Sequence, residues 1–388
     1  MKITKVETIL VGAHRLILRL HTDEGLIGLG EPFAGGRARS CATAIEQLES
    51  YLLGKDPRRV VHHWQGMFRH ASHRGGWILT SALSGVEQAL WDLAGKAAGL
   101  PVHLLLGGVC RDRVRMCGLV GGDTPDSAAD SVHDSMAAGF TAGKMVLPVS
   151  AAADLPGHGP GRIVDIFAAM REAGGPGYDL AIDFGGRMAP QEALSVIRAL
   201  EPHEPLYVAE PIGPRNVDGM TALSRQTRIP IAIGAHVYTK GGFQEILEKK
   251  AARIIQLNIS RAGGISEGCL IAGLAQAHRV AVVLHSPPGP IGMAASLHLA
   301  ACIPNLLVQE SALSGEGDLN GGPRLVGGQS PVPPGHGLAV TLDDDTLAVL
   351  AEQQHHQGPP MPAIEPTRRS SANMAEPALR TEASPWLG

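Results

Sequence analysis

The sequence has few cysteines, and none of them is placed for a disulfide framework. There are five, an odd number scattered along the chain without a C-x-x-C pair: Cys41, Cys110, Cys117, Cys269 and Cys302. This pattern favours reduced thiols in a cytoplasm over the disulfides of a small secreted domain. Residues 1–15 lack the apolar stretch of a signal peptide, and no apolar run could span a bilayer. We therefore expect a cytoplasmic protein without membrane contact.

A strong charge of either sign is also missing. The formal net charge is -4, and 18% of the residues are charged, which gives no indication of nucleic-acid binding. What the chain does have is length and apolar content, with 388 residues of which 44% are hydrophobic. This is enough for a large core, and a barrel with one additional domain matches the size.

A repeated pattern of strand, loop and helix dominates the chain from residue 114 onwards. Six of its apolar strand-like runs end in Asp183, Glu210, Ala235, Asn258, His285 and Glu310. The ends recur about every 25 residues, which is close to one unit of a (β/α)8 barrel. In that fold the C-terminal strand ends surround the active site, so we interpret these positions as one site.

The pattern predicts an α/β protein in which a TIM barrel carries an N-terminal α+β capping domain. We assign residues 1–112 to the cap, 113–330 to the barrel and 331–351 to a segment that returns to the cap, with a strand at 338–342. The proline- and glycine-rich segment 148–162 is a loop, either over the barrel mouth or simply on the surface. Residues 352–388 are predicted to form a poorly ordered tail.

Short motifs spread over residues 1 to about 345 resemble those of the enolase superfamily. They include residues 22–25 (TDEG), 81–85 (SALSG), 105–108 (LLGG), 183–187 (DFGGR), 262–265 (AGGI) and 289–291 (GPI). Within that superfamily the chain resembles the mandelate racemase/muconate lactonizing enzyme group, and in particular its galactonate dehydratase-like acid-sugar dehydratases. The resemblance implies a lyase that abstracts a proton next to a carboxylate, with a magnesium ion stabilising the enediolate.

Four site positions agree with what the resemblance implies. Asp183 and Glu210 match the first two metal ligands, His285 matches the seventh-strand histidine of proton transfer, and Glu310 matches the eighth-strand glutamate. Lys144 on the second strand is either a cation that faces the substrate carboxylate or a member of a salt bridge.

Other positions depart from the family pattern. Ala235 stands where the third metal carboxylate is expected, so magnesium would be held more weakly, by two carboxylates. His236 follows it, but neighbouring strand residues point to opposite sides, so we expect a packed or solvated side chain. Asn258 replaces the aspartate behind His285; it can still accept a hydrogen bond, or it can select the wrong tautomer. Gly185 replaces the acid that protonates the leaving hydroxyl.

These departures leave three functions open. The first is a divergent lyase or isomerase that acts on a carboxylate or sugar-like small molecule without the standard magnesium site. The second is an ordinary magnesium-dependent acid-sugar dehydratase. The third is a non-catalytic binding protein on the same fold. Family members are often oligomeric, so we expect a homo-oligomer.

Overall fold

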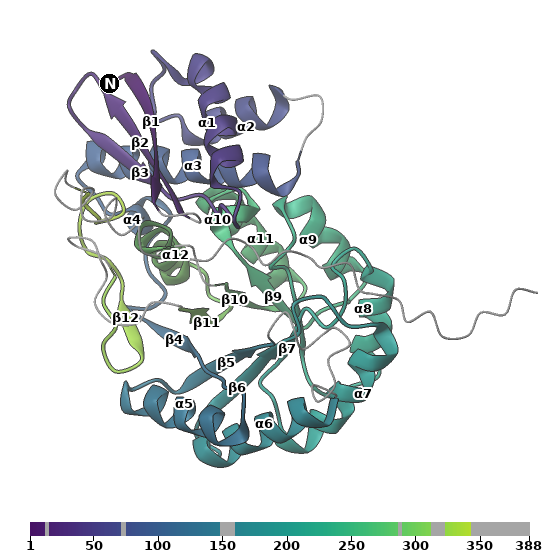
Figure 1. Cartoon of the computed structure of the whole chain (residues 1–388). Helices are drawn as coiled ribbons and strands as arrows, with labels where there is room; N and C mark the ends of the chain where they lie inside the picture. Colours follow the sequence, from purple (N-terminus) through teal and green to yellow (C-terminus); the bar gives the residue numbers. More distant parts are fainter. Residues whose placement is uncertain (12–14, 71–74, 148–159, 286–288, 312–322, 343–388) are drawn as a thin grey trace, which may run out of the picture.

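The computed structural model of the chain describes residues 1–11, 15–70, 75–147, 160–285, 289–311 and 323–342. It contains an N-terminal cap that lies against a barrel (Figure 1). Of the loop expected at 148–162, residues 148–159 lie outside the described residues, as does the expected tail, and residues 160–162 are helical instead. Among the helices that are described, none is both long and apolar enough to cross a membrane.

The cap combines a three-stranded antiparallel sheet with helices. Its strands are β1 (Ile3–Val11), β2 (Arg15–Thr22) and β3 (Ile27–Gly30). Its helices are α1 (Ala38–Leu52), α2 (Val60–His70), α3 (Trp77–Ala98) and the short α4 (Val102–Leu105). The apolar residues of α3 recur at helical spacing and are buried, so this helix forms the centre of the cap.

Eight parallel strands close into a barrel, which confirms the predicted fold class. In chain order they are β4 (Arg113–Leu119), β5 (Ala142–Val146), β6 (Asp179–Asp183), β7 (Val208–Ala209), β8 (Ile231–Ile233), β9 (Ile254–Leu257), β10 (Ala281–Leu284) and β11 (Leu306–Glu310). The last strand pairs with the first through Gln309 and Met116, so the sheet has no open edge there. The strand ends predicted to form one site therefore share one face of the barrel.

Helices connect these strands and cover the outside of the barrel (Figure 1). They are α5 (Pro125–Ala137), α6 (Pro160–Gly174), α7 (Pro190–Leu200), α8 (Val217–Ser224), α9 (Thr239–Glu248), α10 (Ile259–Ala262), α11 (Ile265–Ala277) and α12 (Pro290–Cys302). A 3-10 turn, Glu201–His203, follows α7.

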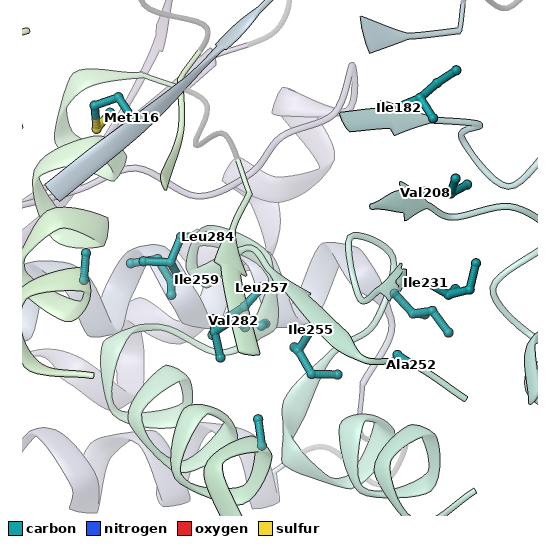
Figure 2. Close-up of a cluster of buried hydrophobic side chains, with 14 of the residues drawn as sticks. Met116, Ile182, Val208, Ile231, Ala252, Ile255, Leu257, Ile259, Val282 and Leu284 are labelled. Atoms are coloured by element: carbon teal, nitrogen blue, oxygen red, sulfur yellow. The ribbon is translucent and has the colours of Figure 1, made fainter. Parts of the chain in front are cut away.

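Side chains along each barrel strand alternate between outside and inside. Outward-facing residues such as Ile182 and Val208 are buried in the main apolar cluster (Figure 2). Small inward-facing residues, including Ala142 and Ala181, belong to a separate cluster inside the barrel. Because the strand period is two, Lys144 and Asp183 point to the same interior as these alanines.

The C-terminal segment returns to the cap in a form that differs from the prediction. Strand β12 (Gln329–Pro331) pairs antiparallel with β4. The prediction of a strand at 338–342 is wrong, because these residues do not pair with a neighbouring strand. Gly337 has a φ of 65° and turns the chain, and the N–H of Leu338 then donates to Asp92 Oδ1 at 2.8 Å. The alternating apolar side chains at 338–342 are buried individually, without a neighbouring strand.

Candidate functional site

Polar side chains from the strand ends meet at the C-terminal mouth of the barrel in three groups. The first joins Lys144, Asp183 and Glu310 by ion pairs. The second is a contact between Asn258 and His285. The third joins Glu210 to the backbone of the β8 end, at residues 234 and 235. All the predicted site positions thus belong to one of these contacts.

Lys144 is a buried cation between two carboxylates. Its Nζ lies 2.6 Å from Glu310 Oε2 and 3.4 Å from Asp183 Oδ2, and the residue is 2% exposed. Burial lowers the pKa of Lys144, but the two carboxylates outweigh this and raise it. Lys144 therefore stays charged as the centre of a salt bridge. It also lines an open hollow of about 410 Å³ together with Asp123 and Val146.

Glu310 is held ionised inside the barrel. Burial alone would raise its pKa, but Lys144 and His285 lower it to about 2. Its Oε1 accepts hydrogen bonds from Tyr207 at 3.0 Å and from Gln256 Nε2 at 2.8 Å. Neither of these donors is among the residues predicted from the sequence. Gln256 could have been predicted as a site residue, because it is a polar residue in an apolar strand. It precedes Asn258 by two positions and so lies on the same face.

The orientation of Asn258 determines which nitrogen of His285 carries the proton. Asn258 Oδ1 accepts the N–H of Ser260 at 3.0 Å as the N-cap of α10, so the amide NH₂ is left to face the histidine. The distance from Asn258 Nδ2 to His285 Nδ1 is 3.2 Å. An amide nitrogen only donates, so Nδ1 accepts and the neutral ring carries its proton on Nε2. Burial lowers the pKa of His285, which favours this neutral form.

Glu210 is buried with half of its carboxylate satisfied. Its Oε1 accepts the N–H groups of Gly234 at 2.8 Å and Ala235 at 2.9 Å. Its Oε2 has no hydrogen-bond partner among the described residues, although Glu210 is 0% exposed. The backbone at Glu210 has a φ of 43°, an uncommon conformation for this residue type that often marks functional positions.

His236 has a solvent-exposed side chain, which is one of the two environments expected for it, and it also lies near Glu210. Its Nδ1 lies 3.9 Å from Glu210 Oε2. Strand β8 ends at Ile233, and Gly234 has a φ of 141°, so the alternation of strand side chains no longer holds at His236. His236 is therefore a neighbour of the unsatisfied Glu210 oxygen, although its side chain is 45% exposed.

Arg261, which is not among the predicted site residues, also lies at this end of the barrel. Its Nη1 donates to the carbonyl oxygen of Ala235, and its Cζ lies 3.9 Å from the ring centroid of Phe33 in the cap. Its Nε is buried and has no hydrogen-bond partner in the described part of the chain. Burial lowers the pKa of Arg261, while Tyr238 and Glu210 oppose that effect. The guanidinium and Glu210 thus flank the same alanine.

The guanidinium of Arg187 lies over the position where a side chain of residue 185 would begin. A Cβ added to Gly185 would lie 3.1 Å from Cζ of Arg187, whose Nη1 donates to the Leu147 carbonyl at 3.1 Å. The φ of Gly185 is 65°, in the left-handed region. The position implied for the leaving-group acid is therefore occupied by a cation.

Replacing Gly185 by histidine is expected to lower the free energy of unfolding by about 1–2 kcal/mol, the cost of a left-handed non-glycine residue. Gly175→His is the matched control, because its φ is 61° and nothing lies within 4 Å of an added Cβ. The guanidinium of Arg187 is flexible and can move aside, so thermal unfolding should show similar losses for both variants. A much larger loss for Gly185→His would mean that Arg187 is held rigidly.

The donors at the mouth do not match the three-carboxylate magnesium set that the resemblance implies. Within the described residues, no group of three His, Cys, Asp or Glu side chains is placed to hold a metal ion. Asp183 Oδ1 already accepts the N–H of Gly185 at 2.8 Å, and Oδ2 faces the Lys144 ammonium. Ala235 supplies no side-chain oxygen. Of the Asp183 and Glu210 carboxylate oxygens, Oε2 of Glu210 has no hydrogen-bond partner within the described residues and could ligate a cation.

Two protein-family profiles match most of the chain. The N-terminal domain of mandelate racemase/muconate lactonizing enzyme matches residues 5–107. The enolase C-terminal domain-like family matches residues 127–346.

Individual proteins similar to this chain have names that agree with these profiles. A D-galactonate dehydratase of Verminephrobacter eiseniae is 40% identical over 81% of this chain and 82% of its own. One from Xanthomonas oryzae pv. oryzae is 37% identical over 97% of this chain and 100% of its own. The crystal structure of a putative dehydratase from Mesorhizobium loti superposes with a TM-score of 0.84 at 30% identity, covering 90% of this chain and 98% of the other.

Proposed function

Because this chain belongs to the enolase superfamily, in its mandelate racemase/muconate lactonizing enzyme group, we propose that it is a divergent acid-sugar lyase or isomerase. It acts on a small hydroxy-carboxylate at the barrel mouth, by proton transfer next to the carboxylate. It does so without the three-carboxylate magnesium site. The observation that carries this proposal is the Lys144 ammonium, bound to the carboxylates of Asp183 and Glu310.

The charges at the mouth support a site without a divalent ion. The Lys144 ammonium forms ion pairs with Asp183 and Glu310, and the guanidinium groups of Arg187 and Arg261 donate to backbone carbonyls at the same mouth. Buried carboxylates without a partner would repel one another and neutralise by taking up protons. Fixed side-chain cations prevent this, and they take over the balancing role that an ion would have.

In this proposal His285 is the group that exchanges a proton with the substrate. Its Nε2 is the nitrogen not engaged by Asn258, and Glu310 lies close enough to influence its charge. To accept a proton on Nε2, the ring must first move its own proton to Nδ1, against the amide of Asn258. Proton abstraction is therefore slow in this chain, and hydrogen-bond donation from Nε2 to a substrate oxygen is favoured.

The test is an assay of D-galactonate and related aldonic acids with and without EDTA. Product is expected in both, because no step depends on a bound metal ion. His285→Ala is expected to lower the rate by about 10²–10⁴, the range of general acid–base catalysis. His278→Ala, at the exposed end of α11, is the control and should leave the rate unchanged.

A second candidate is an ordinary magnesium-dependent acid-sugar dehydratase. The names of the relatives favour it, as does the unsatisfied Oε2 of Glu210, which could ligate a cation. Turnover that stops in EDTA and returns with magnesium would select this candidate. Ligand binding without any product would instead leave a non-catalytic binding protein.

A further inference from the structure

Two buried polar atoms without a hydrogen-bond partner among the described residues belong to side chains that contact Ala235. One is Oε2 of Glu210, and the other is Nε of Arg261. Both residues are tied to this alanine, since Glu210 Oε1 accepts its N–H at 2.9 Å and Arg261 Nη1 donates to its carbonyl. The two side chains thus share a contact with the residue at the position implied for the third metal ligand.

The chemistry of the two atoms is complementary. An ionised carboxylate oxygen only accepts hydrogen bonds, and a guanidinium N–H only donates. Leaving a buried polar group unsatisfied is unfavourable. A ligand that satisfies both atoms must present a hydrogen-bond acceptor beside a donor. A carboxylate with a hydroxyl on the adjacent carbon has this arrangement, and guanidinium groups bind carboxylates well.

The surroundings hold the guanidinium in place. Phe33 of the cap stacks on it at 3.9 Å, and the N–H of Phe33 donates to the Ser260 carbonyl at 2.9 Å, next to Arg261 in the chain. Ala235 is 4% exposed, and its methyl group supplies no polar atom that could satisfy either of the two atoms. Arg261 is therefore positioned by the cap, the β8 end and α10 together.

We propose that Arg261 and Glu210 form a metal-free binding site for 2-hydroxy carboxylates. Arg261 Nε–H binds a carboxylate oxygen of the ligand, and Glu210 Oε2 accepts the 2-hydroxyl. This rests on the proposed function, because it identifies the part of the substrate that the same barrel mouth recognises. It adds a recognition role for an arginine and for the free oxygen of a buried glutamate.

The test is titration calorimetry in EDTA with three probes: D-galactonate, 2-deoxy-D-galactonate and galactitol. Arg261→Met should weaken D-galactonate binding about 10–100-fold, the value of a charge-assisted hydrogen bond, and should not affect galactitol, which has no carboxylate. Glu210→Gln should weaken D-galactonate binding, with a smaller effect on the 2-deoxy probe. Arg225→Met, at the C-terminal end of α8, is the control and should bind like the wild type.

A purely structural role for Arg261 would weaken all three probes equally, and that result would overturn the inference. Arg261→Lys keeps the charge without the Nε–H, so a folded Lys variant with wild-type affinity would overturn it too, as would a wild-type chain that does not bind D-galactonate. Binding with the expected selectivity but without product would leave the inference standing and remove the proposed reaction. Turnover with unchanged affinity in Arg261→Met would overturn the inference and leave the proposed reaction standing.

Discussion

Asn258→Asp is expected to raise the rate of D-galactonate turnover by about 10²–10⁴, which is the usual contribution of a general base. In the wild type the amide of Asn258 donates to His285 Nδ1 at 3.2 Å and keeps the ring proton on Nε2. An aspartate of the same shape would accept from Nδ1–H, so that Nε2 would carry no proton and could take one from the substrate. It would also stabilise the imidazolium that forms.

This substitution has a matched control in the same chain. Asp can keep the cap of α10, because Oδ1 still accepts the N–H of Ser260. Asn216→Asp makes the same change at another N-cap, where Oδ1 accepts the N–H of Gly219 at 2.9 Å, and should leave turnover unchanged. The nitrogen chemical shifts of His285 report the tautomer directly. A wild-type ring with its proton on Nδ1 would contradict the account.

Lys144→Met is expected to destabilise the protein by about 3–5 kcal/mol and to abolish turnover. The substitution leaves the carboxylates of Glu310 and Asp183 buried without their cation, and breaking one half of a buried ion pair has a cost of this size. The residue is 2% exposed, so solvent cannot replace the ammonium. Thermal unfolding measures the loss. Lys249→Met removes an exposed ion pair with Asp218 and Glu245, and should not change the melting temperature.

Acid unfolding provides an independent readout of the same ion pair. The pKa of Glu310 is lowered from 4.5 to about 2, so its ionised form stabilises the fold above pH 4.5. That contribution is lost progressively as the pH falls from 4.5 towards 2. Without Lys144 the pKa of Glu310 rises, and the acid transition moves to higher pH. An unchanged acid transition in Lys144→Met would show that the pair does not hold Glu310 ionised.

The barrel could be predicted because its strands repeat a simple pattern. Strand ends such as Asp183 and Glu310 follow apolar runs at the spacing of one strand–helix unit, so their convergence needs only the topology of the fold. The prediction of a strand at 338–342 was wrong because alternating apolar residues indicate only which side chains are buried. Burial there comes from single contacts with the cap and not from pairing with another strand.

The contacts within the site could not be predicted in the same way. Arg261 reaches the mouth from a four-residue helix, and no periodic pattern marks the end of a long flexible side chain. The nearness of His236 to Glu210 could not be predicted, because the left-handed backbone of Gly234 ends the strand one residue earlier than the apolar pattern indicated. The tautomer of His285 depends on the cap formed by Asn258 with Ser260, which is a contact of the folded chain.

The central claim is that side-chain cations have taken the place of the magnesium ion at the barrel mouth. Titration calorimetry of the metal-stripped protein with magnesium chloride tests this most directly, with Arg261→Met beside the wild type. The account predicts no saturable heat of binding for the wild type at stoichiometric concentrations. Tight binding near one equivalent, lost when Asp183 or Glu210 is replaced by its amide, would contradict it.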